Sequence, residues 1–126
     1  MNGVLVDTSV WVDHFRREIQ GLVYLLERDR VMVHPMVLGE LACETPPNRA
    51  PILVDLDSLR NTQQATLKET LDFVESEELF GLGCGLVDML LLASTMMSPQ
   101  TELWTLDKRL SASAERFGVM HRPQAH

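Results

Sequence analysis

The chain has 126 residues, 45% of them hydrophobic, and its 18 acidic and 11 basic residues give a net charge of −7. This size predicts one globular domain, residues 1–126, with one hydrophobic core. The excess of acids argues against a protein that grips nucleic acid through a broad basic face, but not against an enzyme that gathers carboxylates around a cation. Because no apolar stretch is long enough for a membrane span and the N-terminus lacks a signal-peptide pattern, we expect a cytoplasmic protein.

The N-terminal stretch predicts a strand that ends on a carboxylate. Residues 4–6, Val-Leu-Val, are typical of a strand covered on both faces, and Asp7 follows directly. A carboxylate at the end of a buried strand is costly unless it is paired or the strand opens into a crevice, which is where open α/β sheets bind ligands. Thr8 and Ser9 are good N-caps for a following helix. We therefore expect a site at Asp7.

The rest of the chain alternates helical and strand patterns. Hydrophobic periodicity predicts a first helix ending at residue 17, helices over 19–28, 36–44, 48–59, 66–75, 86–97 and 107–117, strands over 31–33 and 103–106, and a last edge strand at 119–120. This alternation predicts an α/β fold with a mostly parallel sheet. The helix over 66–75 should bury Leu67, Leu71 and Val74, and the very apolar helix over 86–97 should lie across the sheet.

Two further features receive structural interpretations. Cys43 and Cys84 lack the spacing of a zinc or redox pair, so we expect reduced, buried thiols. The glycine-rich loop at 81–85 follows no clear strand and has no Lys-Ser or Lys-Thr after it, which argues against a nucleotide-binding loop.

Four acids are placed to meet at one edge of the predicted sheet. Asp7 and Asp107 follow strands, Asp88 lies in the first turn of a helix, and Glu40 lies in a helix that itself follows a strand. The carboxyl ends of parallel strands and the N-termini of the following helices share one rim. Two charges about 4 Å apart repel by about 4 kcal/mol at an effective dielectric of 20, so converging carboxylates would raise pKa values or bind a cation. Oxygen ligands without His or Cys favour Mg²⁺ or Mn²⁺, which can activate water against a phosphodiester.

Each of these acids also has an ordinary structural explanation. Glu40 could be a boundary residue that reaches water, Asp88 a partner of the helix dipole, and Asp107 a plain N-cap. The metal hypothesis therefore depends on all four acids being brought together.

Four stretches in this order have a family resemblance. They are Val-Asp-Thr-Ser-Val-Trp at 6–11, Leu-Gly-Glu-Leu-Ala at 38–42, Gly-Leu-Val-Asp-Met-Leu-Leu-Leu-Ala at 85–93 and Leu-Trp-Thr-Leu-Asp-Lys-Arg-Leu at 103–110. Over nearly its whole length the sequence resembles the PIN-domain ribonucleases, in particular the VapC-type toxins of bacterial toxin–antitoxin pairs.

The resemblance implies a PIN-like three-layer α/β fold and a Mg²⁺-dependent endoribonuclease, with tRNA or ribosomal RNA as substrate. It also implies a homodimer and a cognate antitoxin whose C-terminal segment blocks the groove. The residues matching the family's acids are Asp7, Glu40 and Asp88, with Asp107 as the more variable fourth, and Ser9 and Thr105 match small polar residues that support them.

Two positions depart from the family pattern. Leu82 stands where many relatives have a basic residue in the glycine-rich loop, and Leu90 stands where a His is frequent. Both changes remove RNA contacts, so they bear on substrate choice and catalytic rate more than on the metal site.

Three alternatives stay open at this point. An aspartate-nucleophile phosphatase needs a second acid two residues after Asp7, where this chain has Ser9. A receiver domain needs an acidic pair beside the first strand and a Lys placed elsewhere than Lys108. A catalytically silent PIN-like binding module, in which the acids only cap helices, would match the same sequence features.

Overall fold

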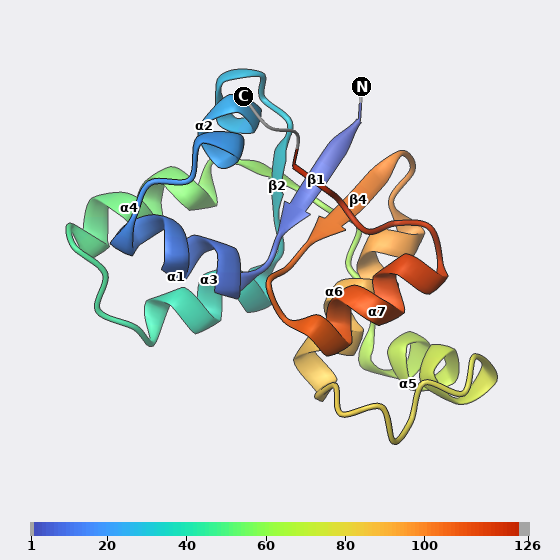
Figure 1. Cartoon of the computed structure of the whole chain (residues 1–126). Helices are drawn as coiled ribbons and strands as arrows, with labels where there is room; N and C mark the ends of the chain where they lie inside the picture. The colour runs from blue at the N-terminus through green and yellow to red at the C-terminus, as the bar shows by residue number, and fades with distance from the viewer. Residues whose placement is uncertain (1, 124–126) are drawn as a thin grey trace.

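The computed structural model describes residues 2–123, which contain one four-stranded, all-parallel sheet of order β3-β2-β1-β4 with helices around it (Figure 1). The strands are β1 (Gly3–Val6), β2 (Val31–Val33), β3 (Arg60–Asn61) and β4 (Thr101–Trp104). The helices are α1 (Thr8–Arg16), α2 (Gln20–Glu27), α3 (Pro35–Ala42), α4 (Arg49–Asp57), α5 (Leu67–Ser76), α6 (Leu86–Met97) and α7 (Lys108–Arg116). The predicted α/β fold with a parallel sheet is confirmed.

Strand β1 lies inside the sheet, between β2 and β4. Its residues 4–6 have no exposed surface, as expected for an apolar run covered on both faces. Val6 is in register with Trp104, and the Asp7 N–H donates to the Trp104 carbonyl at 2.9 Å. The carboxyl ends of β1 and β4 are therefore level, so the residues that follow them begin side by side.

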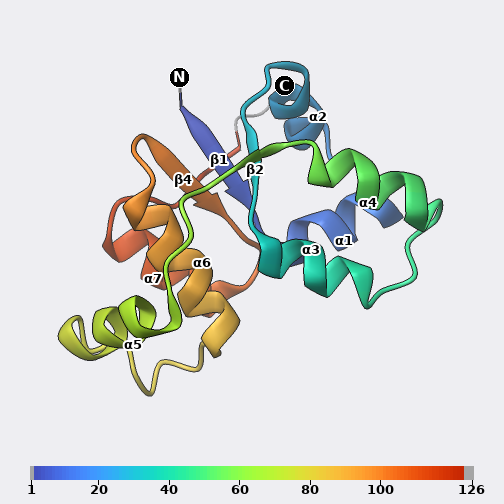
Figure 2. The same ribbon diagram turned by 180° about the vertical axis from the view of Figure 1, so that it is seen from behind.

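The helices form two groups. Figures 1 and 2 show α1 to α4 on one side of the strands and α5 to α7 on the other, and β1 and β4 point into the region between the groups. Helix α6 packs on β4 and contacts both α5 and α7, and the middle of α6 is buried. This arrangement brings helices from both groups to the carboxyl edge of the sheet.

Some predicted strand boundaries were wrong. Strand β3 was not predicted, because its two residues, Arg60 and Asn61, carry no apolar pattern. Strand β4 runs over 101–104 rather than 103–106, and Leu106 is half exposed. The expected edge strand at 119–120 is a single bridge between Leu103 and Met120.

The predicted buried face of α5 was right for Val74, which packs against the core, and wrong for Leu67 and Leu71. Leu67 and Leu71 are 55% and 52% exposed, whereas Thr70 is fully buried. The Thr70 hydroxyl donates to the Thr66 carbonyl at 2.9 Å, so this polar group enters the interior with its hydrogen bond satisfied. Because Thr70 takes the inward position, the leucines at neighbouring angles around the helix face outward.

The two cysteines are free thiols, as expected, but their expected burial was wrong. Cys43 is exposed at the C-cap of α3, and Cys84 is only half-buried. No helix within residues 2–123 combines the length and apolar character needed to cross a bilayer.

Candidate active site

Asp7 is a buried carboxylate that two hydroxyl groups hold in place. It is 6% exposed, and its Oδ2 accepts hydrogen bonds from Ser9 Oγ and Thr105 Oγ1, each at 2.8 Å. Ser9 lies in the first turn of α1, which follows β1, and Thr105 directly follows the neighbouring strand β4, so the two donors come from segments far apart in the sequence. Two donors on one oxygen fix the orientation of the carboxylate.

The same hydroxyl groups also fix the turn that follows β4. Ser9 Oγ accepts from the Leu106 N–H at 3.0 Å, and Thr105 Oγ1 accepts from the Asp107 N–H at 3.1 Å. This network ties the start of α1 to the start of α7 across about a hundred residues of sequence.

The expected helix-capping role of the two hydroxyl residues was wrong. Asp7 itself is the N-cap of α1 and makes no side-chain cap hydrogen bond. Ser9 bonds to Asp7, and Thr8 donates to Glu40 Oε1 at 2.7 Å. The helix begins at Thr8, which is earlier than a cap by Thr8 or Ser9 would require, so both residues lie inside its first turn and their hydroxyl groups are free to donate to the carboxylates.

Glu40 is exposed on α3. The start of this helix is fixed by His34, a residue that the sequence analysis did not single out. His34 is buried, and its Nδ1 accepts from the Met36 N–H at 3.0 Å, which caps α3 ahead of Pro35. Burial lowers the pKa of His34, which favours the neutral ring that such an acceptor requires. A residue with an acceptor side chain directly before Pro35 was the available signal.

Asp88 and Asp107 each lie at the start of a helix. Asp107 Oδ1 accepts from the N–H groups of Arg109 and Leu110 at 2.9 and 3.0 Å, so the expected N-cap is present. Asp88 Oδ2 accepts from the Gly85 N–H at a longer 3.4 Å. Asp88 is thus the more weakly held of the two carboxylates.

The charges of the other three acids affect the pKa of Asp88. Partial burial is the main cause that raises its pKa, and the charges of Asp7, Asp107 and Glu40 raise it further, against the lowering effect of the Gly85 hydrogen bond. The structure therefore brings the four acids into one electrostatic neighbourhood.

The four acids offer oxygen ligands of the kind that a hard dication prefers, but their side chains do not converge on one point. No three His, Cys, Asp or Glu side chains of residues 2–123 stand as ligands of one ion. Glu40 and Asp107 instead make hydrogen bonds within the protein. The available ligands are carboxylate and hydroxyl oxygens, which Mg²⁺ and Mn²⁺ prefer, and a dication would relieve the repulsion that raises the pKa of Asp88.

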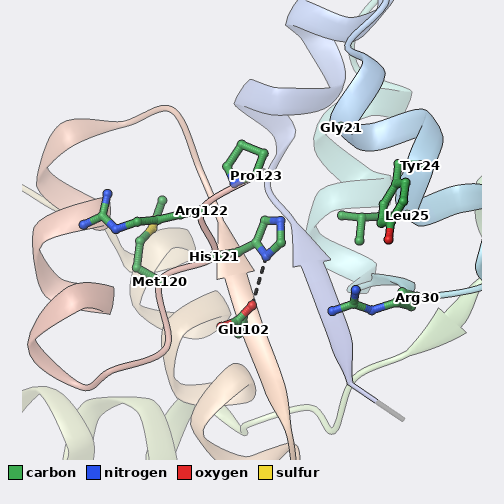
Figure 3. A pocket seen from close by; sticks show the side chains of 9 residues that line it. All are labelled: Gly21, Tyr24, Leu25, Arg30, Glu102, Met120, His121, Arg122 and Pro123. Carbon is green, nitrogen blue, oxygen red and sulfur yellow. Dashed lines mark hydrogen bonds and ion pairs between the residues drawn. The ribbon is translucent and has the colours of Figure 1, made fainter. Parts of the chain in front are cut away.

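A cavity of about 440 Å³ lies away from the four acids, between α2, the amino-terminal half of β4 and the segment after α7 (Figure 3). Glu102 and His121 line it, with Glu102 Oε1 and His121 Nδ1 at a hydrogen-bond distance of 2.9 Å that becomes an ion pair when the ring is protonated, and Arg30 lies across from them. Arg30 Nε also donates to the Asn2 carbonyl at 3.1 Å. Arg30 and His121 line the same cavity as Glu102, whereas no basic side chain forms an ion pair with any of the four acids among residues 2–123.

Comparisons with known proteins agree with the fold and with the resemblance. No protein-family model matches the chain. The chain is 40% identical over 116 residues to Ribonuclease VapC32 of Mycobacterium tuberculosis, in both strain CDC 1551 / Oshkosh and strain H37Rv, covering 92% of this chain and 94% of that protein. The crystal structure of PAE2754 from Pyrobaculum aerophilum superposes with a TM-score of 0.56 at 17% identity, covering 88% of this chain and 78% of that chain, which shows a shared fold.

Proposed function

The chain belongs to the VapC family of ribonucleases, and on this premise we propose that it is a toxin endoribonuclease whose four acids hold a divalent cation. One observation carries the assignment of the site. The charges of Asp7, Asp107 and Glu40 all raise the pKa of Asp88, although the four residues are far apart in the sequence. Such a concentration of like charge is destabilising unless a cation or a proton balances it.

Each acid has a distinct role in this proposal. When bound, Mg²⁺ or Mn²⁺ would polarise a phosphate oxygen and lower the pKa of a water molecule. Asp7 is the fixed ligand, since Ser9 and Thr105 already orient it. A bound cation would offset the like charges that raise the pKa of Asp88, and Glu40 and Asp107 would complete the set from the two helix groups.

The proposal also covers the substrate, the protein partners and the cellular location. We expect the substrate to be tRNA or ribosomal RNA, the setting to be the cytoplasm, and the chain to act as a homodimer that a cognate antitoxin inhibits. Exposed apolar side chains support a protein partner, because half-exposed leucines on α5 and methionines on α6 are costly in water. These residues are Leu67, Leu71, Met96 and Met97.

A silent PIN-like binding module is the second candidate. It is favoured by the hydrogen bonds that already occupy Glu40 and Asp107, and by the lack of three ready-made metal ligands among residues 2–123. In that case the acids would position helices and RNA would be bound without being cut.

The deciding experiment incubates the purified protein with total bacterial RNA and maps new RNA ends by sequencing. We expect defined ends with Mg²⁺ or Mn²⁺ and none with EDTA. Asp7→Asn should lower the rate on the order of a hundredfold or more, since metal positioning supplies several kcal/mol of barrier reduction.

The matched control is Glu102→Gln, which removes the same charge away from the four acids and should cleave normally. Equal cleavage by wild type and Asp7→Asn would overturn the proposed site. RNA binding without cleavage under any metal condition would instead favour the silent module.

A further inference from the structure

The Arg109 side chain lies over the glycine-rich loop, two residues after the proposed site acid Asp107. Its Nη1 makes a long hydrogen bond of 3.4 Å to the Gly83 carbonyl. A Cβ atom at Gly83 would lie 2.7 Å from Arg109 Cδ and 2.8 Å from its Nη1, so only glycine leaves room for this packing. Gly83 also has a φ of +88°, a left-handed conformation that glycine adopts without strain. The loop is thus shaped to receive the guanidinium.

The Arg109 cation acts on the same neighbour, Cys84, as two of the acids, and it forms no ion pair with them among residues 2–123. Burial, Asp88 and Asp107 raise the pKa of the Cys84 thiol, whereas a Ser113 hydrogen bond and the Arg109 charge lower it. Charges of both signs are therefore felt at Cys84. Among the ion pairs found within residues 2–123, none involves Arg109, so its charge stays available to a ligand.

The surrounding sequence makes this cation important for an anionic substrate. Residues 80–85, Phe-Gly-Leu-Gly-Cys-Gly, contain no basic side chain, so Arg109 supplies the loop with a charge that it lacks. The four acids repel RNA, and a planar guanidinium can bind phosphate oxygens through two parallel hydrogen bonds. A cation held at this position would offset part of that repulsion.

We propose that Arg109, docked on Gly83, forms a phosphate-binding subsite beside the acids and takes a backbone phosphodiester group of the RNA strand. The inference rests on the proposed ribonuclease function. It assigns Arg109 as a substrate-binding residue, and Gly83 as the residue that positions its side chain. Lys108, its exposed neighbour, makes no such contact with the loop among the hydrogen bonds of residues 2–123 and serves as the matched control.

The test measures binding of a short fluorescein-labelled, single-stranded RNA of mixed sequence by anisotropy, with Mg²⁺ present and with Asp88→Asn as the background that prevents cleavage. Arg109→Gln should weaken binding about tenfold, as for loss of a charge-assisted contact. It should also reduce the slope of log affinity against log salt by about 0.7, the value for one phosphate on a single strand. Lys108→Gln should change affinity by less than about twofold and leave that slope unaltered.

Two further variants separate position from charge. Gly83→Ala keeps the Arg109 charge but displaces its side chain, so it should lose most of the same affinity. Arg109→Lys keeps the charge without the planar fork and should bind with intermediate affinity. Thermal melts of all variants report whether the fold is retained.

Equal losses in Arg109→Gln and Lys108→Gln would overturn the subsite, because they would show only a general charge effect. An unchanged salt slope in Arg109→Gln would overturn it too. In proteins with Asp88 intact, the subsite predicts that Arg109→Gln raises KM more than it lowers kcat. Failure of the wild type to cut RNA would count against the proposed function, while the binding measurements would still decide the subsite.

Discussion

Two regions of the molecule differ in how their charges are balanced. In the amino-terminal half of β4, Glu102 lies at a hydrogen-bond distance from His121, and Arg30 lies across from them, beside a cavity of about 440 Å³. At the carboxyl edge, Asp7 is buried with hydroxyl donors and Asp88 has a raised pKa because of its burial and its acidic neighbours. The first region has volume and internal pairing, and the second has an excess of one charge.

Under the proposed function, unbalanced charge rather than cavity volume marks the edge of the sheet where we expect the reaction. An ion pair such as that of Glu102 is satisfied within the chain and contributes little beyond local stability. A group of carboxylates without enough cations nearby is costly, so a chain keeps one mainly where an external cation completes it. Four predictions test this difference in charge balance.

The largest expected effect is the difference in cleavage rate between two variants that each lose one acid, Asp88→Asn and Glu102→Gln. Asp88→Asn should lower kcat/KM for RNA on the order of a hundredfold or more, because it removes a proposed metal ligand. Glu102→Gln should leave kcat/KM within about twofold, since it changes only a partly exposed ion pair. Cleavage assays on both variants check this, and similar losses in both would remove the distinction between the two regions.

A second contrast uses two threonines at opposite ends of one strand. Thr105→Val removes a donor to Asp7 and should lower kcat about tenfold while costing about 1–3 kcal/mol of unfolding free energy. Thr101→Val removes a hydroxyl whose partners are the Pro99 carbonyl and Met32 Sδ, so it should affect stability alone. Urea unfolding with parallel rate measurements tests the pair. A normal kcat in Thr105→Val would show that Asp7 does not need this donor.

A third contrast follows from the raised pKa of Asp88. In EDTA, the folded state binds the Asp88 proton more tightly than the unfolded state does, so this group contributes stability below its unfolded pKa that is lost as pH rises through the folded pKa. Asp88→Asn should therefore melt at a higher temperature than wild type near neutral pH. The advantage should shrink when Mg²⁺ is added, because the cation stabilises the wild type. A lower melting temperature for Asp88→Asn in EDTA would contradict the proposed repulsion.

The smallest effect should be the stability cost of losing the pair between Glu102 and His121. Glu102→Gln should lower the free energy of unfolding by up to about 1 kcal/mol, and the loss should decrease at high salt because added ions screen the pair. Urea unfolding at two salt concentrations measures it. A cost well above this range would mean that the two regions are more alike in their electrostatics than the comparison holds.

The sequence alone determined the α/β class, the buried first strand and the sheet edge to which the acids belong. Alternating periodicities and the apolar run at 4–6 are local signals. Because the strands are parallel, their carboxyl ends share one edge, and this places the acids that follow them there. The resemblance to VapC-type ribonucleases was likewise visible in four short stretches, and the 40% identity to a curated ribonuclease agrees with it.

Only the tertiary structure decided which partner each polar group found. Thr105 reaches Asp7 from 98 residues away, Thr8 binds Glu40 instead of capping a helix, and no local pattern encodes such contacts. Thr70 rather than Leu71 is buried on α5, and local periodicity did not indicate this either. A hydroxyl whose hydrogen bond is satisfied can be buried wherever packing places it. Periodicity records which residues prefer water, whereas the choice among hydrogen-bond partners depends on what the fold brings within about 3 Å.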